Sequence, residues 1–194
     1  MANDGCLGLA PGLTCEYVQN ANLVSLRFLA AAAFLALAAS GCGSSKSSNQ
    51  GSSQKTVWDH FTIDVGGHPA SLEVAVFPAE QGHGLMQRSD LGRDEGMIFV
   101  NPRPRSLSFW MRNTPEPLDI AYLAPDGAIA EIYQLLPFDE RPVASHSDQL
   151  QFALEMPQGW FAANGIRAGA RIDLKAVSAA LKARGFDPVK FGLE

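Results

Sequence analysis

Cysteine is absent from the whole sequence after Cys42, and the 194 residues hold only two more, Cys6 and Cys15. The chain beyond Cys42 therefore has no disulfide, no thiol nucleophile and no thiolate ligand for a metal. An excess of basic residues is also lacking, because the net charge is −5. Proteins that bind nucleic acid need a basic face that displaces counterions. We therefore expect no nucleic-acid partner.

The common motifs of catalysis are missing as well. The four histidines are scattered, with no pair at the i, i+4 spacing that would place two metal ligands on one helix face: His60, His68, His83 and His146. The sequence contains no G-x-S-x-G elbow and no glycine-rich phosphate loop that opens a helix. We expect no metal site and no cofactor, and the sequence by itself names no reaction.

No apolar run reaches the length of about 20 residues that a membrane-spanning helix needs. The run from Phe28 to Ala39 follows Arg27 and suits the hydrophobic region of a signal peptide. Its ending, ASGC at 39–42, resembles the lipobox of bacterial lipoproteins, which implies that Cys42 is acylated and becomes the mature N-terminus. We expect an exported protein, anchored by lipid to the cell-envelope membrane, with its domain facing the periplasm or the exterior. An ordinary secretory peptide with an incidental cysteine is the alternative.

Composition divides the chain into four parts. Residues 1–41 form the leader, although 1–23 are polar and acidic and do not suit a signal peptide. We expect translation to start at Leu23 or Val24; a genuine extension is the alternative. Residues 42–55 are a flexible Gly/Ser tether, 56–174 a single β-rich domain, and 175–194 a C-terminal helix and tail.

Alternating apolar and polar residues predict short strands over 57–65, 70–77, 106–112, 119–124 and 128–135. Further strands are expected at 96–100, 149–156 and 171–174, with hairpin turns at Gly66-Gly67 and Pro125-Asp126-Gly127. Residues 101–105 should be a loop, because prolines do not fit inside a sheet. Helix is limited to parts of 78–88, 159–164 and 175–184. The sequence predicts a mainly β protein, a compact sandwich or barrel without a parallel sheet.

Several spaced motifs carry a family resemblance: GLMQRSDL, DEGMIFV, SFWMRNTPEPLDIAYL, FALEMPQGW and GIRAG. Together they resemble the bacterial and archaeal family called domain of unknown function 192, over roughly Thr56 to Leu174. The resemblance implies a compact, β-rich, jelly-roll-like domain that is often exported and whose activity is uncharacterised.

The segment Ser106–Arg112 should present two different faces. Alternation directs Leu107, Phe109 and Met111 toward the core, and Ser108, Trp110 and Arg112 the other way. An indole beside hydrogen-bond donors is what a sugar, aromatic or carboxylate ligand needs for stacking and orientation. We therefore predict a ligand groove beside Trp110. A second-layer core position for Trp110 is the alternative.

The predicted lining of this groove is Arg88, Trp110, Arg112, Asn113, Asp119 and Glu155. Asn113 can equally serve as a turn-building residue, because short polar side chains before proline commonly bond to nearby backbone.

The two carboxylates, Asp119 and Glu155, leave the function open. They could act as an acid–base pair on a glycosidic bond of an envelope polysaccharide. Each could instead form a structural ion pair with Arg88 or Arg112, because buried charges are rarely left unpaired. A third alternative is a structural or partner-binding module with no small ligand.

Overall fold

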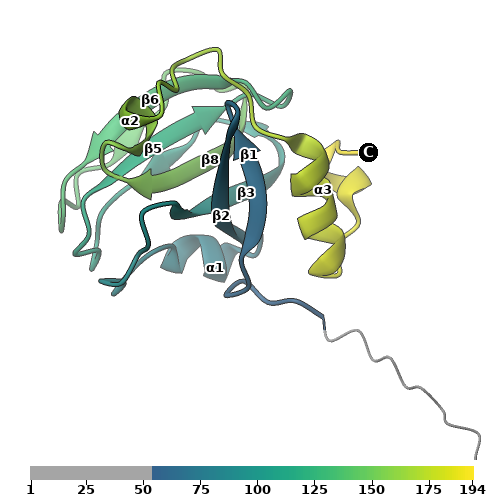
Figure 1. Ribbon diagram of the computed structural model, residues 1–194, viewed down its shortest axis with the longest axis horizontal. Helices are drawn as coiled ribbons and strands as arrows, with labels where there is room; N and C mark the ends of the chain where they lie inside the picture. Colours follow the sequence, from purple (N-terminus) through teal and green to yellow (C-terminus); the bar gives the residue numbers. More distant parts are fainter. Residues whose placement is uncertain (1–53) are drawn as a thin grey trace, which may run out of the picture. The chain divides into compact units, whose positions relative to one another are not determined.

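The computed structural model describes residues 54–194, so the leader, Cys42 and most of the predicted tether lie outside the described residues. The described part is mainly β, with short helices and a helix near its end (Figure 1). The strands are β1 (Phe61–Val65), β2 (His68–Ala75), β3 (Glu95–Arg105), β4 (Ser108–Phe109), β5 (Leu118–Leu123), β6 (Ile129–Leu135), β7 (Val143–Ala144) and β8 (Leu150–Pro157). The helices are α1 (Pro78–His83), α2 (Trp160–Ala163), α3 (Leu174–Ala183) and a 3-10 turn, η1 (Pro188–Phe191).

Six of the strands form one mixed sheet in the order β1-β2-β3-β8-β5-β6, and β4 pairs with β7 in a small second sheet. The described strands do not close into a barrel, because β1 and β6 end the pairing order. The sheet contains one parallel pair, β2 with β3. We expected none. The connection from β2 to β3 crosses over through α1, and a crossover of that length returns the chain in the same direction.

The large sheet is covered on both faces, so its strands are apolar on both sides. One face, here called the helix face, includes the cross-strand row Val74, Ile98, Leu154 and Ala121 and packs against α2, α3 and η1. The other, the loop face, includes the next row, Ala75, Phe99, Ala153 and Tyr122. The segment after α1 and the β4–β7 sheet cover the loop face through Leu85, Leu107, Met111, Phe109 and Val143.

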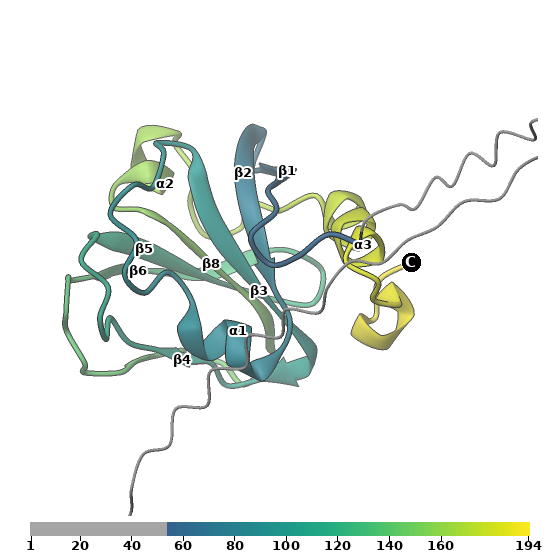
Figure 2. The same ribbon diagram turned by 90° about the horizontal axis from the view of Figure 1, so that it is seen from below.

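The C-terminal helix is part of the core. Asp173 begins α3 by accepting hydrogen bonds from the backbone N–H groups of Lys175 and Ala176, which satisfies donors that a helix start leaves free. Val177 and Leu181 are fully buried against the helix face. Figures 1 and 2 both place α3 beside β1, at the end of the domain away from α2. Among residues 54–194, no helix has the length and apolar character of a membrane span.

Two proline residues sit inside a strand that we expected to end before them. β3 continues through Pro102 and Pro104 to Arg105, but its pairing with β8 jumps from Val100–Phe152 to Arg105–Leu150. The prolines therefore lie in a β-bulge, where no ladder hydrogen bond is demanded of them. The expectation of a loop at 101–105 was wrong because it did not consider a bulge.

Three other expected strands differ. The first strand begins at Phe61, because Thr56 and Asp59 form a turn. Of the segment 106–112, only Ser108–Phe109 pairs, since its partner β7 is equally short. Residues 171–174 contribute two isolated bridges rather than a strand. Gln54 and Lys55, expected to end the flexible tether, hydrogen-bond to the carbonyls of Arg184 and Ala183.

Candidate functional site

A carboxyl group lies in the middle of the loop face. Glu155 on β8 is directly opposite Met97 on β3 and Ile120 on β5, and directly paired residues point to the same side of a sheet. The side chain is 4% exposed. Within residues 54–194 it forms no ion pair, and burial alone raises the pKa of Glu155 to about 8. Near neutral pH the group is therefore mostly a protonated acid that can donate a hydrogen bond.

Glu155 borders a small chamber of about 30 Å³, roughly the space of one water-sized group. The chamber lies between the sheet, the end of α1 with the residues after it, and the segment that follows β4. Its lining is Gln81, Gly82, His83, Gly84, Leu85, Met86, Phe109, Trp110, Thr114 and Glu155. The side chain of Glu155 forms no hydrogen bond within residues 54–194, and this chamber is where a ligand group would reach its carboxyl oxygens.

Trp110 separates this chamber from a larger groove. The side chain is 45% exposed and lines both spaces. The groove has a volume of about 320 Å³ and is otherwise lined by Met111, Gln134, Leu135, Leu136, Asp139, Arg141, Pro142 and Val143. Arg112 lies over the indole, with its guanidinium carbon 5.8 Å from the ring centroid, which suits a cation–π contact. Leu107 and Met111 are buried and Trp110 is not, so the predicted alternation of faces is confirmed.

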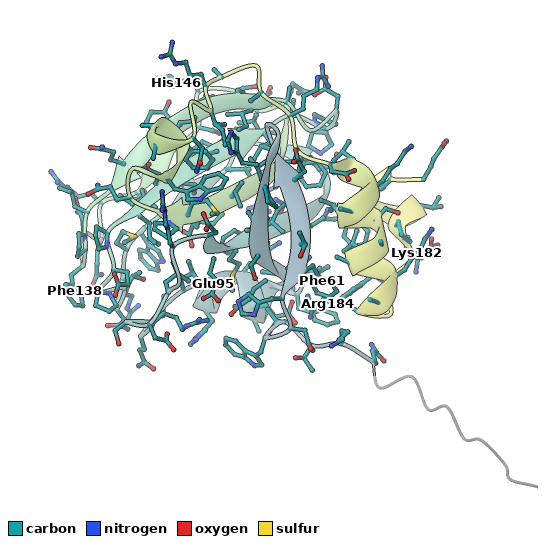
Figure 3. The ribbon with its side chains drawn as sticks, in the orientation of Figure 1. Phe61, Glu95, Phe138, His146, Lys182 and Arg184 are labelled. Atoms are coloured by element: carbon teal, nitrogen blue, oxygen red, sulfur yellow. The ribbon has the colours of Figure 1, made fainter. Side chains whose placement is uncertain are left out.

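Three loops meet around Trp110, and each holds a non-glycine residue at positive φ: Gln87 at 61°, Asn113 at 53° and Phe138 at 59°. The backbone N–H of Gln87 donates to the carbonyl of Asn113 (2.8 Å), and that of Phe138 donates to the carbonyl of Thr114 (3.1 Å). Such conformations cost energy and persist where the surroundings impose them, often at ligand sites. Figure 3 shows Phe138 at the end of the domain opposite Lys182 of α3.

Arg88 is engaged elsewhere. Its Nη1 donates to Oε1 of Glu73 (2.6 Å) and its Nε to Oδ1 of Asp90 (3.0 Å). These hydrogen bonds, led by that of Glu73, raise the pKa of Arg88 above its ordinary value. Arg88 lines neither the chamber nor the groove.

Asp119 points away from Glu155. It pairs with Met156 and Gln134 across the sheet and so lies on the helix face, one position from Ile120 on the loop face. Its Oδ2 accepts a hydrogen bond from the backbone N–H of Gly159 (2.8 Å). Burial raises the pKa of Asp119, and this hydrogen bond opposes the shift. It borders a separate pocket of about 300 Å³.

The structure thus brings together part of the predicted set. Trp110 and Glu155 line one site, and the backbone of Asn113 supports it. Arg112 contacts the indole of Trp110 but lines neither the chamber nor the groove. Neither Asp119 nor Glu155 forms the expected ion pair with an arginine among the described residues. The two carboxylates occupy opposite faces and cannot flank one glycosidic bond.

Sequence reasoning missed Gly84, Met86 and Thr114, which line the chamber. Gly84 and Met86 belong to the GLM motif, whose density of large side chains was the available signal. Thr114 also helps to build the turn, because its Oγ1 donates to the carbonyl of Arg112 (3.1 Å). Within residues 54–194, no three His, Cys, Asp or Glu side chains gather closely enough to hold a metal ion.

Comparison with known proteins places the same core region in a family. The model of the family DUF192, described as uncharacterized ACR, matches residues 61–174, which is more than half of the chain. None of the curated proteins compared with the chain matches it.

Two solved structures are similar to this chain. One, from Sinorhizobium meliloti 1021, is provisionally described as a transcription regulator. It is 28% identical, with a TM-score of 0.57, and the match covers 61% of this chain and 96% of that one. The other, from Novosphingobium aromaticivorans DSM 12444, is a protein of unknown function. It is 36% identical, with a TM-score of 0.56, and the match covers 59% of this chain and 84% of that one.

Proposed function

The chain belongs to the DUF192 family, which brings no reaction with it, and we propose that it is a ligand-binding domain of the cell envelope. The site comprises the chamber that Glu155 borders and the groove beside Trp110. The leader, and Cys42 as an acylated N-terminus, would anchor the domain by lipid to the envelope membrane, with the site facing the periplasm or exterior.

One observation carries the proposal: Glu155 is 4% exposed and forms no hydrogen bond or ion pair within residues 54–194, and it lies at the wall of a chamber that Trp110 also lines. Burial raises the pKa of this carboxyl group. Buried polar groups are normally hydrogen-bonded, and an exception calls for an explanation. A ligand oxygen that accepts a hydrogen bond from the protonated carboxyl group of Glu155 would supply this partner. Because the chamber holds about one water-sized group, a hydroxyl or carbonyl oxygen fits it.

The groove suggests the rest of the ligand. Trp110 offers a half-exposed indole face, and Gln134 and the ion pair between Asp139 and Arg141 (2.6 Å) supply polar groups beside it. Stacking on an aromatic face combined with a few polar contacts is the pattern of small-molecule and sugar sites. We therefore propose a neutral, acceptor-bearing ligand with a flat or sugar-like body. Hydrolysis by a carboxylate pair finds no support, because Asp119 and Glu155 lie on opposite faces.

A second candidate function rests on the rim of the groove. Leu136 and Phe138 are large, exposed apolar side chains in the loop beside Trp110. Exposed apolar residues that gather in one place favour a protein contact. A partner segment would then occupy the groove and leave the Glu155 chamber unused.

A thermal-shift screen separates the two. The full chain in mild detergent is mixed with neutral sugars and small amides, beside Trp110→Ala and Glu155→Gln variants. We expect a compound that raises Tm for the parent and loses its effect in both variants; at a hundredfold excess over Kd, it would stabilise by about 2.7 kcal/mol. A compound that acts equally on all three proteins, or no active compound, would count against a small-ligand site.

A further inference from the structure

A second pocket lies on the helix face, between the edge strand β6, helix α2 and the turn after it. Its volume is about 300 Å³, at the lower end of the range for small-molecule sites. Asp119 and Arg167 both border it, with Gln134 on its rim and an apolar wall of Ile132, Phe161 and Ile166. The chamber of Glu155 is on the other face of the sheet, and the groove beside Trp110 shares only Gln134 with this pocket. The binding proposed for this pocket does not involve Gln134.

Asp119 has an oxygen without a partner. The residue is 4% exposed, and one carboxyl oxygen accepts from Gly159. The other, Oδ1, is buried and has no hydrogen-bond partner among residues 54–194. A buried carboxylate oxygen requires a donor. Burial raises the pKa of Asp119, and a cationic donor would favour the ionised form again, because an opposite charge stabilises it.

Arg167 supplies the opposite charge in the same pocket. Its side chain is exposed and forms no ion pair with any residue in the described range 54–194. Its guanidinium is thus available to a ligand carboxylate, for which its fork of donors is well suited. The pocket therefore combines one acceptor that lacks a donor, one cation that lacks an anion, and an apolar wall between secondary-structure elements.

We propose that this pocket binds a free, apolar α-amino acid as a zwitterion. The ammonium group donates to Oδ1 of Asp119, the carboxylate accepts from Arg167, and the side chain packs against Ile132, Phe161 and Ile166. The unpartnered oxygen of Asp119, the guanidinium of Arg167 and the apolar wall then each contact a different part of the ligand.

The probes are leucine, N-acetyl-leucine and leucinamide, with binding measured by calorimetry on the full chain in mild detergent. Leucine carries both charges, N-acetyl-leucine lacks the ammonium and leucinamide lacks the carboxylate. We expect leucine to bind and each derivative to bind roughly tenfold or more weakly, the value of one charge-assisted hydrogen bond. Absence of leucine binding at millimolar concentration, or equal binding by either derivative, would overturn the proposal.

Two variants test the assigned residues. Asp119→Asn keeps an oxygen that can accept from Gly159 and loses the charge; Arg167→Gln changes a side chain at the surface and should leave the fold intact. Each should weaken leucine binding roughly tenfold or more. Arg103→Gln, at an exposed position of β3 that does not border the pocket, should leave leucine binding unchanged. If Asp119→Asn fails to fold, Arg167→Gln decides the proposal alone. Leucine affinity unchanged in Arg167→Gln would overturn it.

Discussion

Glu73 and Glu155 lie on the same face of the large sheet, on either side of Met97, and within residues 54–194 only Glu73 has a cation beside it. The strand spacing puts their Cα atoms about 10 Å apart. Both side chains are buried, but Arg88 contacts Glu73 at 2.6 Å. The fold therefore supplies a counter-charge to Glu73, whereas burial raises the pKa of Glu155. This contrast is the main reason to assign Glu155 to a site and Glu73 to the scaffold.

The first prediction concerns stability against pH. The pKa of Glu155 is raised from 4.5 to about 8 in the fold, so the folded state holds the proton more tightly than the unfolded state between these values. The free energy of unfolding should therefore fall as pH rises from 4.5 to 8, by about 4 kcal/mol for this group. Urea melts at several pH values should show this slope in the parent chain and lose it in Glu155→Gln.

Asp119, whose pKa is also raised, serves as the control for that slope. Asp119→Asn should leave most of it in place, because the shift of Asp119 is opposed by the hydrogen bond from Gly159. Carboxyl groups with a lowered pKa, such as Glu131 and Asp139, change their contribution to the free energy of unfolding only at more acidic pH. Parallel slopes for the parent and Glu155→Gln would contradict the assignment of a raised pKa.

The second prediction concerns Arg88. Arg88→Met should destabilise the domain by about 3 to 5 kcal/mol, because it leaves the buried charge of Glu73 without its closest cation. Adding Glu73→Gln to Arg88→Met should recover most of the lost stability, since no unpaired buried charge remains. Chemical denaturation of the parent, the single variant and the double variant checks this. A double variant no more stable than Arg88→Met would show that the pair does not act as a unit.

The third prediction separates Trp110 from its neighbour on the other face of the segment. Trp110→Ala should change stability by about 1 kcal/mol or less, as exposed positions do. Phe109 stacks edge-on against Phe99, with ring centroids 4.7 Å apart, so Phe109→Ala should cost about 3 kcal/mol or more. Urea melts of both variants beside the parent decide this. Equal, large losses of stability for both variants would make Trp110 a packing residue and would contradict a ligand groove beside it.

The fourth prediction concerns anchoring. Cys42→Ser should release the protein from the membrane fraction, because the proposed acyl chains would have no attachment point. Folding should be unaffected, since no cysteine lies in the described residues. Cell fractionation with immunoblotting measures the distribution. A Cys42→Ser protein that stays in the membrane fraction would show that the apolar leader, rather than lipid, holds it there.

Much of the fold could be predicted from local pattern. The two hairpins follow from turn residues, at Gly66-Gly67 and Gly127, and the faces of Leu107 and Met111 follow from alternation. These features depend on neighbours within a few residues. The bulge at Pro102 and Pro104 could not be predicted in this way, because it depends on how β3 pairs with β8, some fifty residues further along the chain.

The site was harder to predict for the same reason. Asp119 and Glu155 were grouped because both accompany apolar strands, but the register of β5 against β8 decides the face of each. Arg88 was expected near these two carboxylates. Its partner is Glu73, which the parallel crossover between β2 and β3 brings near it. Such relationships depend on which distant segments pair with each other. The local pattern of a single sequence does not predict this pairing.

The most direct test is the titration of Glu155 itself. The full chain with ¹³C-labelled glutamate is followed by NMR in mild detergent, and Glu155→Gln identifies the side-chain carboxyl signal of Glu155. Our account predicts that this signal titrates near pH 8. A midpoint near the ordinary value of 4.5 would mean that Glu155 is ionised at neutral pH and has no proton to offer a ligand, and it would contradict the proposed site.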